Sequence, residues 1–289
     1  MSTIINVLGA GRSGSTILGL MLGNDDSSFF TGEIHAWFRP FRTHHFKFEC
    51  SCGNFDCETW KNLKGLKENV FHENVLKALG VNYVVDSSKN LNWCIDIHSW
   101  YKNKNISIIN FIIYKELINY IYSLWKRGET IDSAIKKYLT YYKRFFQTNL
   151  SGIAIKYEEL ISNTDLILDR VIEYTGQKKT LNREQFWLKQ HHYTFGSGGV
   201  LKQIKDGNSE IKPDLFDDAF ERLIPELKAR IDADKEIQMI LEKLNQIDIL
   251  EYSDYESNMK PKKPIWYYLA KIKKNIKKRI PDDSNKIKF

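Results

Sequence analysis

The feature that most constrains this 289-residue chain lies near its start, where a short apolar segment runs directly into a glycine-rich one. Residues 4–8 (Ile-Ile-Asn-Val-Leu) have the composition of a buried strand. Residues 9–16 (Gly-Ala-Gly-Arg-Ser-Gly-Ser-Thr), here called the glycine loop, follow at once, and residues 15–23 have helical apolar spacing. A strand, a glycine loop and a helix in this order predict a loop whose backbone N–H groups hold a phosphate at the helix N-terminus.

The glycine loop departs from the usual NTP-binding loop at one position. The usual pattern is G-x-x-x-x-G-K-S/T, and Gly9, Gly14 and Thr16 fit it. Ser15, however, occupies the position of the lysine that contacts the β- and γ-phosphates, which disfavours ATP or GTP chemistry. Arg12 can supply a cation instead. A Rossmann-type turn, or a strand-to-helix turn without a ligand, gives a similar pattern.

The rest of the chain alternates strand-like and helix-like segments. Further strands are expected at residues 82–85, 106–113 and 153–157. Helices are expected at residues 116–127, 165–174 and 214–244. This alternation predicts an α/β fold with a central parallel sheet flanked by helices. Residues 37–64 are irregular and rich in cysteine, histidine and aromatic residues, and we expect them to form an insert beside the sheet.

The charge of the chain is concentrated at its C-terminal end. The formal net charge is +7, from 43 basic and 36 acidic residues, but residues 260–289 alone hold eleven Lys or Arg and two Asp. The remainder is close to neutral, so we expect no nucleic-acid partner. Residues 4–8 are too short for a signal core or a membrane span, which predicts a cytoplasmic protein.

The C-terminal segment is predicted to be separate from the folded domain. Pro261 and Pro264 mark a break, and we divide the chain into a domain (residues 1–258) and a basic amphipathic tail (residues 259–289). Residues 265–280 place aliphatic side chains near one helical face and lysines on the other, as in helices that lie on a membrane surface. This predicts a peripheral position at the inner face of the membrane. A helix that packs on the domain or forms a dimer contact is the alternative.

Several segments resemble, in order, those of the sulfotransferase family that uses 3′-phosphoadenosine-5′-phosphosulfate (PAPS). Residues 9–18 resemble its 5′-phosphosulfate loop, and residues 85–89 (Val-Asp-Ser-Ser-Lys) resemble the D-S-S-K element of bacterial members. Residues 113–128 are similar to the family's 3′-phosphate region, and residues 155–160 to its R-Y-E-D-L element. The resemblance extends over about residues 4–205. It implies a P-loop NTPase-like sulfotransferase architecture.

The resemblance also assigns catalytic roles. Glu33 follows Gly32 where bacterial and Golgi-type members carry a glutamate, which implies that Glu33 is the base and His35 the second choice. Arg12 and Lys89 would stabilise the charge on the sulfate and the leaving phosphate. The donor's 5′ end would be held by the loop residues Gly11, Arg12, Ser13, Gly14, Ser15 and Thr16.

The 3′-phosphate contacts match the family less closely. Aligning Ser123 with the family's Y-S pair puts Lys115 where an arginine is usual, and Glu116 and Leu117 replace Asp and Pro. Lysine keeps the charge but loses the bidentate fork. Lys115 and Ser123 are the predicted 3′-phosphate ligands. Two further donor contacts are predicted at Tyr157, in the R-Y-E-D-L element, and at Lys202, beyond the glycines of residues 196–199.

Cys50, Cys52, Cys57 and Trp60 have the spacing of a cysteine-rich insert in bacterial members. With His44 and His45 upstream, the cysteines can form a metal site, but the C-x-C spacing is unusual, and plain structural cysteines are the favoured interpretation. Sulfuryl transfer needs no metal, so none is assigned to the catalytic site. The aromatic residues of the insert either line the acceptor site or form the insert's own core.

The sequence therefore predicts transfer of a sulfuryl group from PAPS to a hydroxyl, on a saccharide or a lipid-linked glycan. Two alternatives differ in chemistry. One is a P-loop nucleotide kinase or NTPase, which Ser15 disfavours. The other is a non-catalytic, membrane-associated nucleotide-binding protein, which the Lys115-Glu116-Leu117 departure favours.

Overall fold

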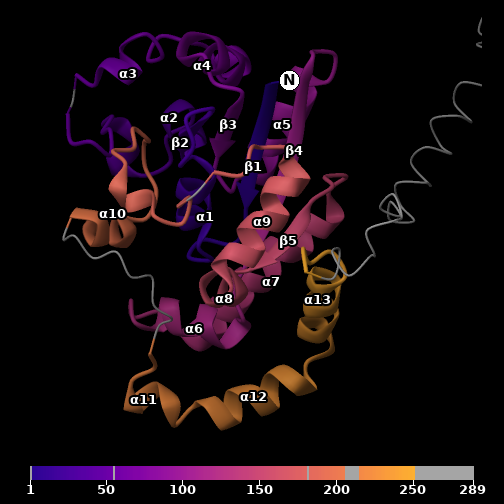
Figure 1. Cartoon of the computed structure of the whole chain (residues 1–289). Coiled ribbons are helices and arrows are strands. Elements are labelled where there is room, and N and C mark those ends of the chain that lie inside the picture. The colour runs from indigo at the N-terminus through magenta and orange to yellow at the C-terminus, as the bar shows by residue number, and fades with distance from the viewer. Residues whose placement is uncertain (1, 55, 181, 206–214, 251–289) are drawn as a thin grey trace, which may run out of the picture. The chain divides into compact units, whose positions relative to one another are not determined.

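The structure is a computed structural model that describes residues 2–54, 56–180, 182–205 and 215–250 (Figure 1). The predicted tail, with its amphipathic segment, lies outside these residues. Within the described ranges, no helix combines the length and the apolarity that crossing a membrane requires.

Five parallel strands form the central sheet, in the order β2-β3-β1-β4-β5 (Figure 1). The strands are β1 (Ser2–Leu8), β2 (Ser28–Gly32), β3 (Tyr83–Asp86), β4 (Ile106–Tyr114) and β5 (Ile153–Lys156). The predicted α/β fold with a parallel sheet is confirmed. Because β1 is central and the order reverses around it, the carboxyl end of β1 is the place where ligands bind in open α/β sheets.

The helices differ widely in length. In chain order the α-helices are α1 (Ser15–Leu22), α2 (Ile34–Phe38), α3 (Glu58–Lys61), α4 (Phe71–Leu79), α5 (Leu91–Tyr101), α6 (Leu117–Trp125), α7 (Ile131–Gln147), α8 (Tyr157–Ser162), α9 (Thr164–Thr175), α10 (Gly198–Lys205), α11 (Asp218–Glu221), α12 (Ile224–Ala233) and α13 (Lys235–Asn245). The described residues also form three short 3-10 helices, η1 (Thr43–Phe46), η2 (Glu68–Val70) and η3 (Phe186–Leu188).

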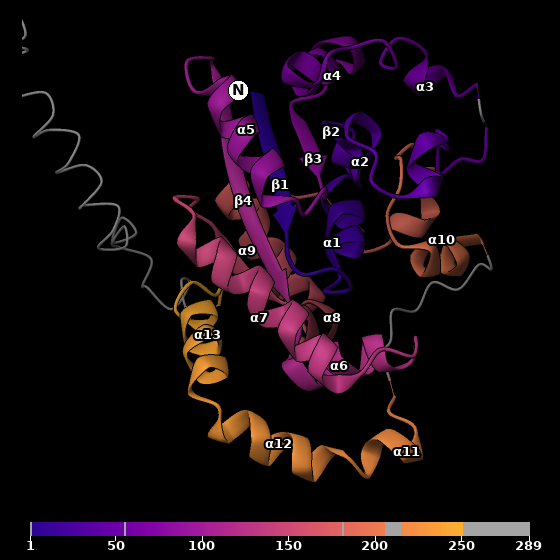
Figure 2. The same ribbon diagram turned by 180° about the vertical axis from the view of Figure 1, so that it is seen from behind.

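Alternate residues of β1 face opposite sides of the sheet. Ile5 and Val7 pack with α1 and α9 on one face of the sheet, which lies toward the viewer in Figure 1. Ile4 and Leu8 point to the other face, where α4, α5, α6 and α7 pack; α5 and α7 are nearer the viewer in Figure 2. The period of two along a strand explains this division.

Both outer edges of the sheet are covered by later segments of the chain. The backbone of Thr194 pairs with Thr31 of β2 and accepts a hydrogen bond from the N–H of Glu33. At the opposite edge, the N–H of Ala154 in β5 donates to Ile247, and Ile249 donates back to Ala154. This satisfies strand groups that would otherwise offer a template for aggregation.

Most predicted elements were confirmed to within two residues, with three corrections. Strand β2 was not expected, because its five residues (Ser-Phe-Phe-Thr-Gly) are short and only partly apolar. The single helical stretch predicted over residues 214–244 is divided into α11, α12 and α13. Pro225 lies in the first turn of α12, and the Asp234 side chain caps α13, so each marks a new helix start. No helix was expected at the positions of α2, α3, α4, α5, α7, α8 or α10 either.

Candidate active site

The glycine loop takes its shape from two close backbone approaches. Gly9 and Gly14 have positive φ angles of 146° and 96°. A Cβ at Gly9 would lie 2.2 Å from the carbonyl oxygen of Ile113, and one at Gly14 would lie 2.3 Å from the ring of Tyr157. A Cβ at Gly11 would meet no described atom within 4 Å. Gly9 and Gly14 are therefore required by the fold, whereas Gly11 borders open space.

Two adjacent tyrosines of α7 accept hydrogen bonds from the backbone of the glycine loop. The hydroxyl of Tyr141 accepts the N–H of Gly9 at 2.9 Å and donates to the carbonyl oxygen of Lys89 at 2.8 Å. The hydroxyl of Tyr142 accepts the N–H of Ala10 at 3.3 Å. Burial raises the pKa of both phenols, so both stay protonated. Neither tyrosine was predicted from the sequence, because nothing local marks a contact with a loop 132 residues away.

The start of α1 presents N–H groups to the loop. Gly14 is the N-cap residue, and no side chain caps the helix. The N–H groups of a first helical turn have no partner within the helix, and they favour an anion. Of the predicted donor ligands, Ser15 lies in this turn, while Ser13 is buried and its hydroxyl lies 3.3 Å from that of Tyr142.

Arg12 and Thr16 contact a segment that lies more than 180 residues further along the chain. This segment, residues 191–197, crosses from the cysteine-rich insert to the glycine loop. The N–H of Ser197 donates to Oγ1 of Thr16 at 3.1 Å, and a guanidinium nitrogen of Arg12 lies 3.5 Å from Oγ of Ser197. Lys202 is exposed on α10, directly after this segment. The structure thus brings together the loop and the predicted 196–202 region.

Glu33 and Lys89, the predicted base and cation, form an ion pair. Lys89 Nζ lies 2.5 Å from Oε1 of Glu33 and 3.1 Å from the carbonyl oxygen of Ser87. The two side chains are 22% and 15% exposed, so both remain accessible to a ligand. Lys89 has a φ of 60°, an uncommon backbone conformation for a non-glycine residue. Strain of this kind is frequent at functional sites.

Asp86 fixes the turn that carries Lys89. Its carboxylate is buried and accepts hydrogen bonds from His72 Nε2 at 2.9 Å, Trp93 Nε1 at 2.8 Å and the N–H of Ser88 at 2.8 Å. Burial alone would raise the pKa of Asp86, but the partners His72, Ser88 and Trp93 hold it below its usual value. The aspartate of the D-S-S-K element is therefore structural.

His35, the second candidate base, is packed inside the protein. Its ring lies beside that of Trp93, with the ring centroids 5.6 Å apart. The backbone N–H of His35 donates to Oγ of Ser88 at 3.0 Å. Burial lowers the pKa of His35, which favours the neutral imidazole.

Lys115 and Tyr157 lie next to the glycine loop at the ends of β4 and β5. Lys115 is 6% exposed, and its Nζ lies 4.3 Å from the centroid of the Tyr157 ring, the ring that packs against Gly14. Ser123 is also buried, and its hydroxyl donates to the carbonyl oxygen of Tyr120 at 2.8 Å. The two predicted 3′-phosphate ligands therefore already have protein partners.

The three cysteines of the insert converge on one histidine. Sulfur atoms of Cys50, Cys52 and Cys57 and a ring nitrogen of His192 all lie within 4.8 Å of one another. His44 and His45, the histidines expected near the cysteines, are not part of this group. His192 was missed because 135 residues separate it from Cys57.

The aromatic residues of the insert form a core of their own. Trp60 is 1% exposed and its ring contacts those of Phe29, Phe48 and Phe71. Phe46, by contrast, is 75% exposed. Of the two roles considered for these residues, the structure favours the insert's core for Trp60 and its neighbours.

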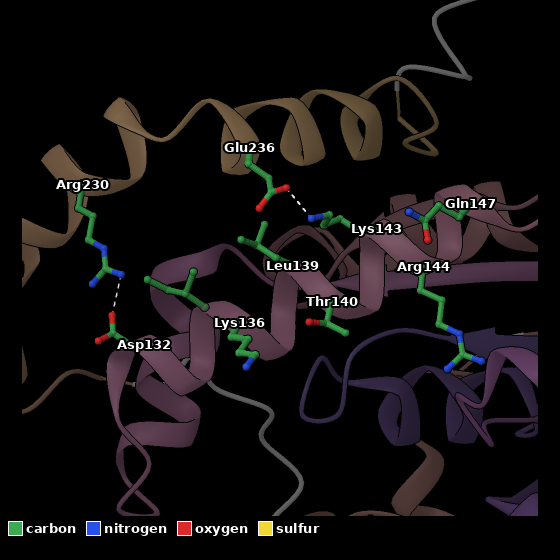
Figure 3. Close-up of a pocket in the computed structure, with 10 residues that line it drawn as sticks. Asp132, Lys136, Leu139, Thr140, Lys143, Arg144, Gln147, Arg230 and Glu236 are labelled. Carbon is green, nitrogen blue, oxygen red and sulfur yellow. Dashed lines mark hydrogen bonds and ion pairs between the residues drawn. The ribbon is translucent and has the colours of Figure 1, made fainter.

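Two hollows lie outside the loop itself. A pocket of 440 Å³ adjoins the insert and the 191–197 segment, and its walls include His44, Lys47, Glu49, Asn54 and Phe195. A larger one, of 710 Å³, lies along α7, facing α12 and α13 (Figure 3). None of the predicted site residues lines the larger pocket. Figure 3 shows it bridged by ion pairs from Lys143 to Glu236 and from Arg230 to Asp132.

A known structure shares this fold. The sulfotransferase domain from the curacin biosynthetic pathway aligns with a TM-score of 0.52 and 16% identity, covering 79% of this chain and 98% of that one. The sulfotransferase domain of the Synechococcus PCC 7002 olefin synthase aligns with a TM-score of 0.46 and 13% identity, covering 78% and 94%. No model of a known protein family and no curated protein sequence matches the chain. The chain thus has the fold of a sulfotransferase domain.

Proposed function

We propose that this protein is a PAPS-dependent sulfotransferase that moves a sulfuryl group to an acceptor hydroxyl. The observation that carries the proposal is the Glu33–Lys89 ion pair at the carboxyl edge of the sheet. Tyr141 connects this pair to the glycine loop, because its hydroxyl bonds both Gly9 and Lys89. A base, a cation and an anion-binding loop in direct connection are what sulfuryl transfer requires.

The glycine loop would hold the 5′-phosphosulfate of the donor. The N–H groups at the start of α1 would bind this anion, which the helix dipole also favours. Arg12 would add a full positive charge. Lys115, at the end of β4, would meet the 3′-phosphate, with Lys202 and Tyr157 at the sides of the nucleotide.

In the proposed reaction the acceptor oxygen attacks sulfur, and the bond from sulfur to the bridging phosphate oxygen breaks. Glu33 takes the proton of the acceptor hydroxyl. The electron pair of the broken bond remains on the 5′-phosphate, giving 3′,5′-adenosine bisphosphate. Lys89 offsets the charge that develops on this leaving oxygen.

The ion pair sets the order of events in this mechanism. While Lys89 contacts Glu33, its ammonium group occupies Oε1 of the carboxylate. Donor binding would offer Lys89 a more highly charged partner in the phosphosulfate. Release of Glu33 would then leave its Oε1 open to the proton of the acceptor hydroxyl, so that transfer proceeds only with both substrates bound.

A saccharide or lipid-linked glycan is the proposed acceptor class. The 440 Å³ pocket beside the 191–197 segment combines polar side chains, such as Lys47, Glu49 and Asn54, with the rings of Tyr193 and Phe195. Sugars use both kinds of contact, hydrogen bonds to their hydroxyls and packing of their apolar faces on aromatic rings.

Glu33→Gln tests the role of the base. We expect kcat with labelled PAPS to fall about 100- to 10,000-fold, because a general base contributes that much. Affinity for 3′,5′-adenosine bisphosphate, measured by calorimetry, should stay unchanged or increase, since Lys89 loses its competing partner. Glu173→Gln makes the same substitution at an exposed glutamate on α9, outside the residues that line the 440 Å³ pocket, and should leave both quantities unchanged.

Thermal unfolding with nucleotides separates this proposal from a kinase or NTPase. The bisphosphate should raise the unfolding midpoint, and ATP with Mg²⁺ should raise it less. The absence of any shift with millimolar bisphosphate would contradict the donor site. A larger shift with ATP and Mg²⁺ would favour nucleotide hydrolysis or phosphoryl transfer instead.

A further inference from the structure

The geometry points to a structural Zn²⁺ site formed by Cys50, Cys52, Cys57 and His192. The three sulfurs and one ring nitrogen are mutually within 4.8 Å. These donors come from two parts of the chain, the cysteine-rich insert and the 191–197 segment. The site is separate from the Glu33–Lys89 pair, and its existence does not depend on sulfuryl transfer.

The donor set and its spacing suit zinc. With Zn–S near 2.3 Å and Zn–N near 2.0 Å, tetrahedral coordination puts sulfur and nitrogen roughly 3.5 Å apart. Nδ1 of His192 lies 3.2 Å from the sulfur of Cys57 and 3.7 Å from that of Cys50. Three thiolates and one imidazole form a common structural zinc set, and they do not suit Mg²⁺ or Ca²⁺, which prefer oxygen ligands.

The local backbone structure brings the three cysteine side chains close together. The N–H of Gly53 donates to the carbonyl oxygen of Cys50, and Gly53 has a φ of 80°, so the chain turns tightly around Cys52. Cys57 is the N-cap of α3. Cys50 and Cys57 are buried and Cys52 is half-buried, which shields the sulfurs while leaving a path for the ion.

His192 is held in place by contacts of its neighbours and its own backbone. The indole N–H of Trp60 donates to the carbonyl oxygen of His192 at 3.0 Å. The N–H of Ser51 donates to the carbonyl oxygen of Tyr193 at 2.8 Å, and the Ser51 hydroxyl donates to His191 at 2.6 Å. These hydrogen bonds hold the insert against the 191–197 segment, with the four donor atoms close to one another.

A metal at this position would fasten the segment that contacts the proposed active site. Thr194 lies two residues beyond His192, and its carbonyl oxygen accepts the N–H of Glu33 at 3.0 Å. Ser197 contacts Thr16 and Arg12 of the glycine loop. Zinc would therefore fix the position of the loop and of the Glu33 backbone without touching a reacting atom.

Metal content of the full chain, purified without a histidine tag under reducing conditions, is the direct test. Elemental analysis should find one zinc per chain. If the protein is purified without metal, titration against a chromogenic chelator should show uptake of one Zn²⁺ per chain. Cobalt substitution should give the d–d absorption of a tetrahedral thiolate site. Cys52→Ser, at the half-exposed ligand, and His192→Ala should lower the zinc affinity at least tenfold.

His44→Ala is the matched control, because His44 is an exposed histidine near the cysteines but outside the group. It should retain one zinc per chain. A strong chelator should lower the unfolding midpoint of the wild-type protein and of this variant, and added zinc should restore it. The proposal is overturned if the reduced wild-type chain neither contains nor takes up zinc, or if Cys52→Ser and His192→Ala bind it as tightly as wild type. Inactive protein that binds one zinc would instead contradict only the proposed sulfuryl transfer.

Discussion

The two ends of the proposed donor site are built differently. At the 5′ end, backbone geometry shapes the glycine loop, and Gly11 borders open space. At the 3′ end, Lys115 lies buried against the ring of Tyr157, and the hydroxyl of Ser123 is already bonded to Tyr120. The 5′ end is formed before a ligand arrives, whereas the 3′ end must exchange protein contacts for phosphate contacts. Preformed sites avoid the cost of such rearrangement, so most of the affinity should reside at the 5′ end.

Tyr157 connects the two ends. One side of its ring fills the space beside Gly14, and Lys115 Nζ lies over the ring. A cation–π contact contributes on the order of 1 kcal/mol, which is less than a charged hydrogen bond to phosphate. A 3′-phosphate would therefore hold Lys115 more strongly than the ring contact does.

The largest effect is expected from Gly14→Ala, which changes the preformed 5′ end of the proposed donor site. The added Cβ would lie 2.3 Å from the Tyr157 ring at a φ of 96°. We expect the free energy of unfolding to fall by about 2 kcal/mol or more, and bisphosphate binding to be lost. Chemical denaturation and calorimetry measure these quantities.

Gly11→Ala is the control for that variant, because its Cβ meets no described atom within 4 Å and its φ is not in the left-handed region. Its stability should stay within about 0.5 kcal/mol of wild type. If Gly14→Ala proved as stable as Gly11→Ala, the loop would not have the rigid shape on which the comparison rests.

Lys115→Ala tests the 3′ end and should have a smaller effect. Loss of one charged phosphate contact should weaken binding of 3′,5′-adenosine bisphosphate about tenfold. Binding of adenosine 5′-phosphosulfate, which lacks the 3′-phosphate, should change little. Lys126→Ala, which removes a lysine over the Tyr122 ring at the end of α6, should leave both affinities unchanged. Equal losses for the two nucleotides would place Lys115 elsewhere than at the 3′-phosphate.

Ser123→Ala should have a still smaller effect on nucleotide binding. The Ser123 hydroxyl donates to Tyr120 within α6, so it has no proton directed at a ligand. We expect the bisphosphate affinity to fall no more than about twofold, and stability to change by about 1 kcal/mol or less. A tenfold loss of affinity, measured by calorimetry, would mean that the hydroxyl turns toward the phosphate on binding.

The smallest effect on activity is expected outside both ends, from His35→Gln. Burial lowers the pKa of His35 in the folded state, so the folded protein binds fewer protons here than the unfolded chain. The stability contributed by neutral His35 is complete above the unfolded pKa of about 6.5 and is lost as the pH falls below it, by at most about 1.4 kcal/mol per pH unit. Denaturation between pH 7.5 and 5.5 should show a shallower slope for the variant, with kcat nearly unchanged. A large drop in kcat would make His35, not Glu33, the base.

The buried strands and the glycine loop could be predicted from the sequence alone. The β-branched residues of β1 and β4 predicted buried strands, and Gly9 and Gly14 predicted a loop that only glycine can form. Glu33 was selected from its position after Gly32 and the first helix, and Lys89 from its position after D-S-S; the structure puts their charged atoms 2.5 Å apart. The strand and loop predictions succeed because strand burial and positive φ angles depend on a few consecutive residues.

Only the tertiary structure decided which distant residues complete these sites. Tyr141 and Tyr142 support a loop more than 130 residues away, and His192 joins cysteines that precede it by a similar distance. Likewise, β2 forms as a strand because β3 and Thr194 satisfy its backbone, since its five residues have little preference of their own. Such contacts depend on how the sheet and its covering helices close around one another, and no short segment of the sequence records that closure.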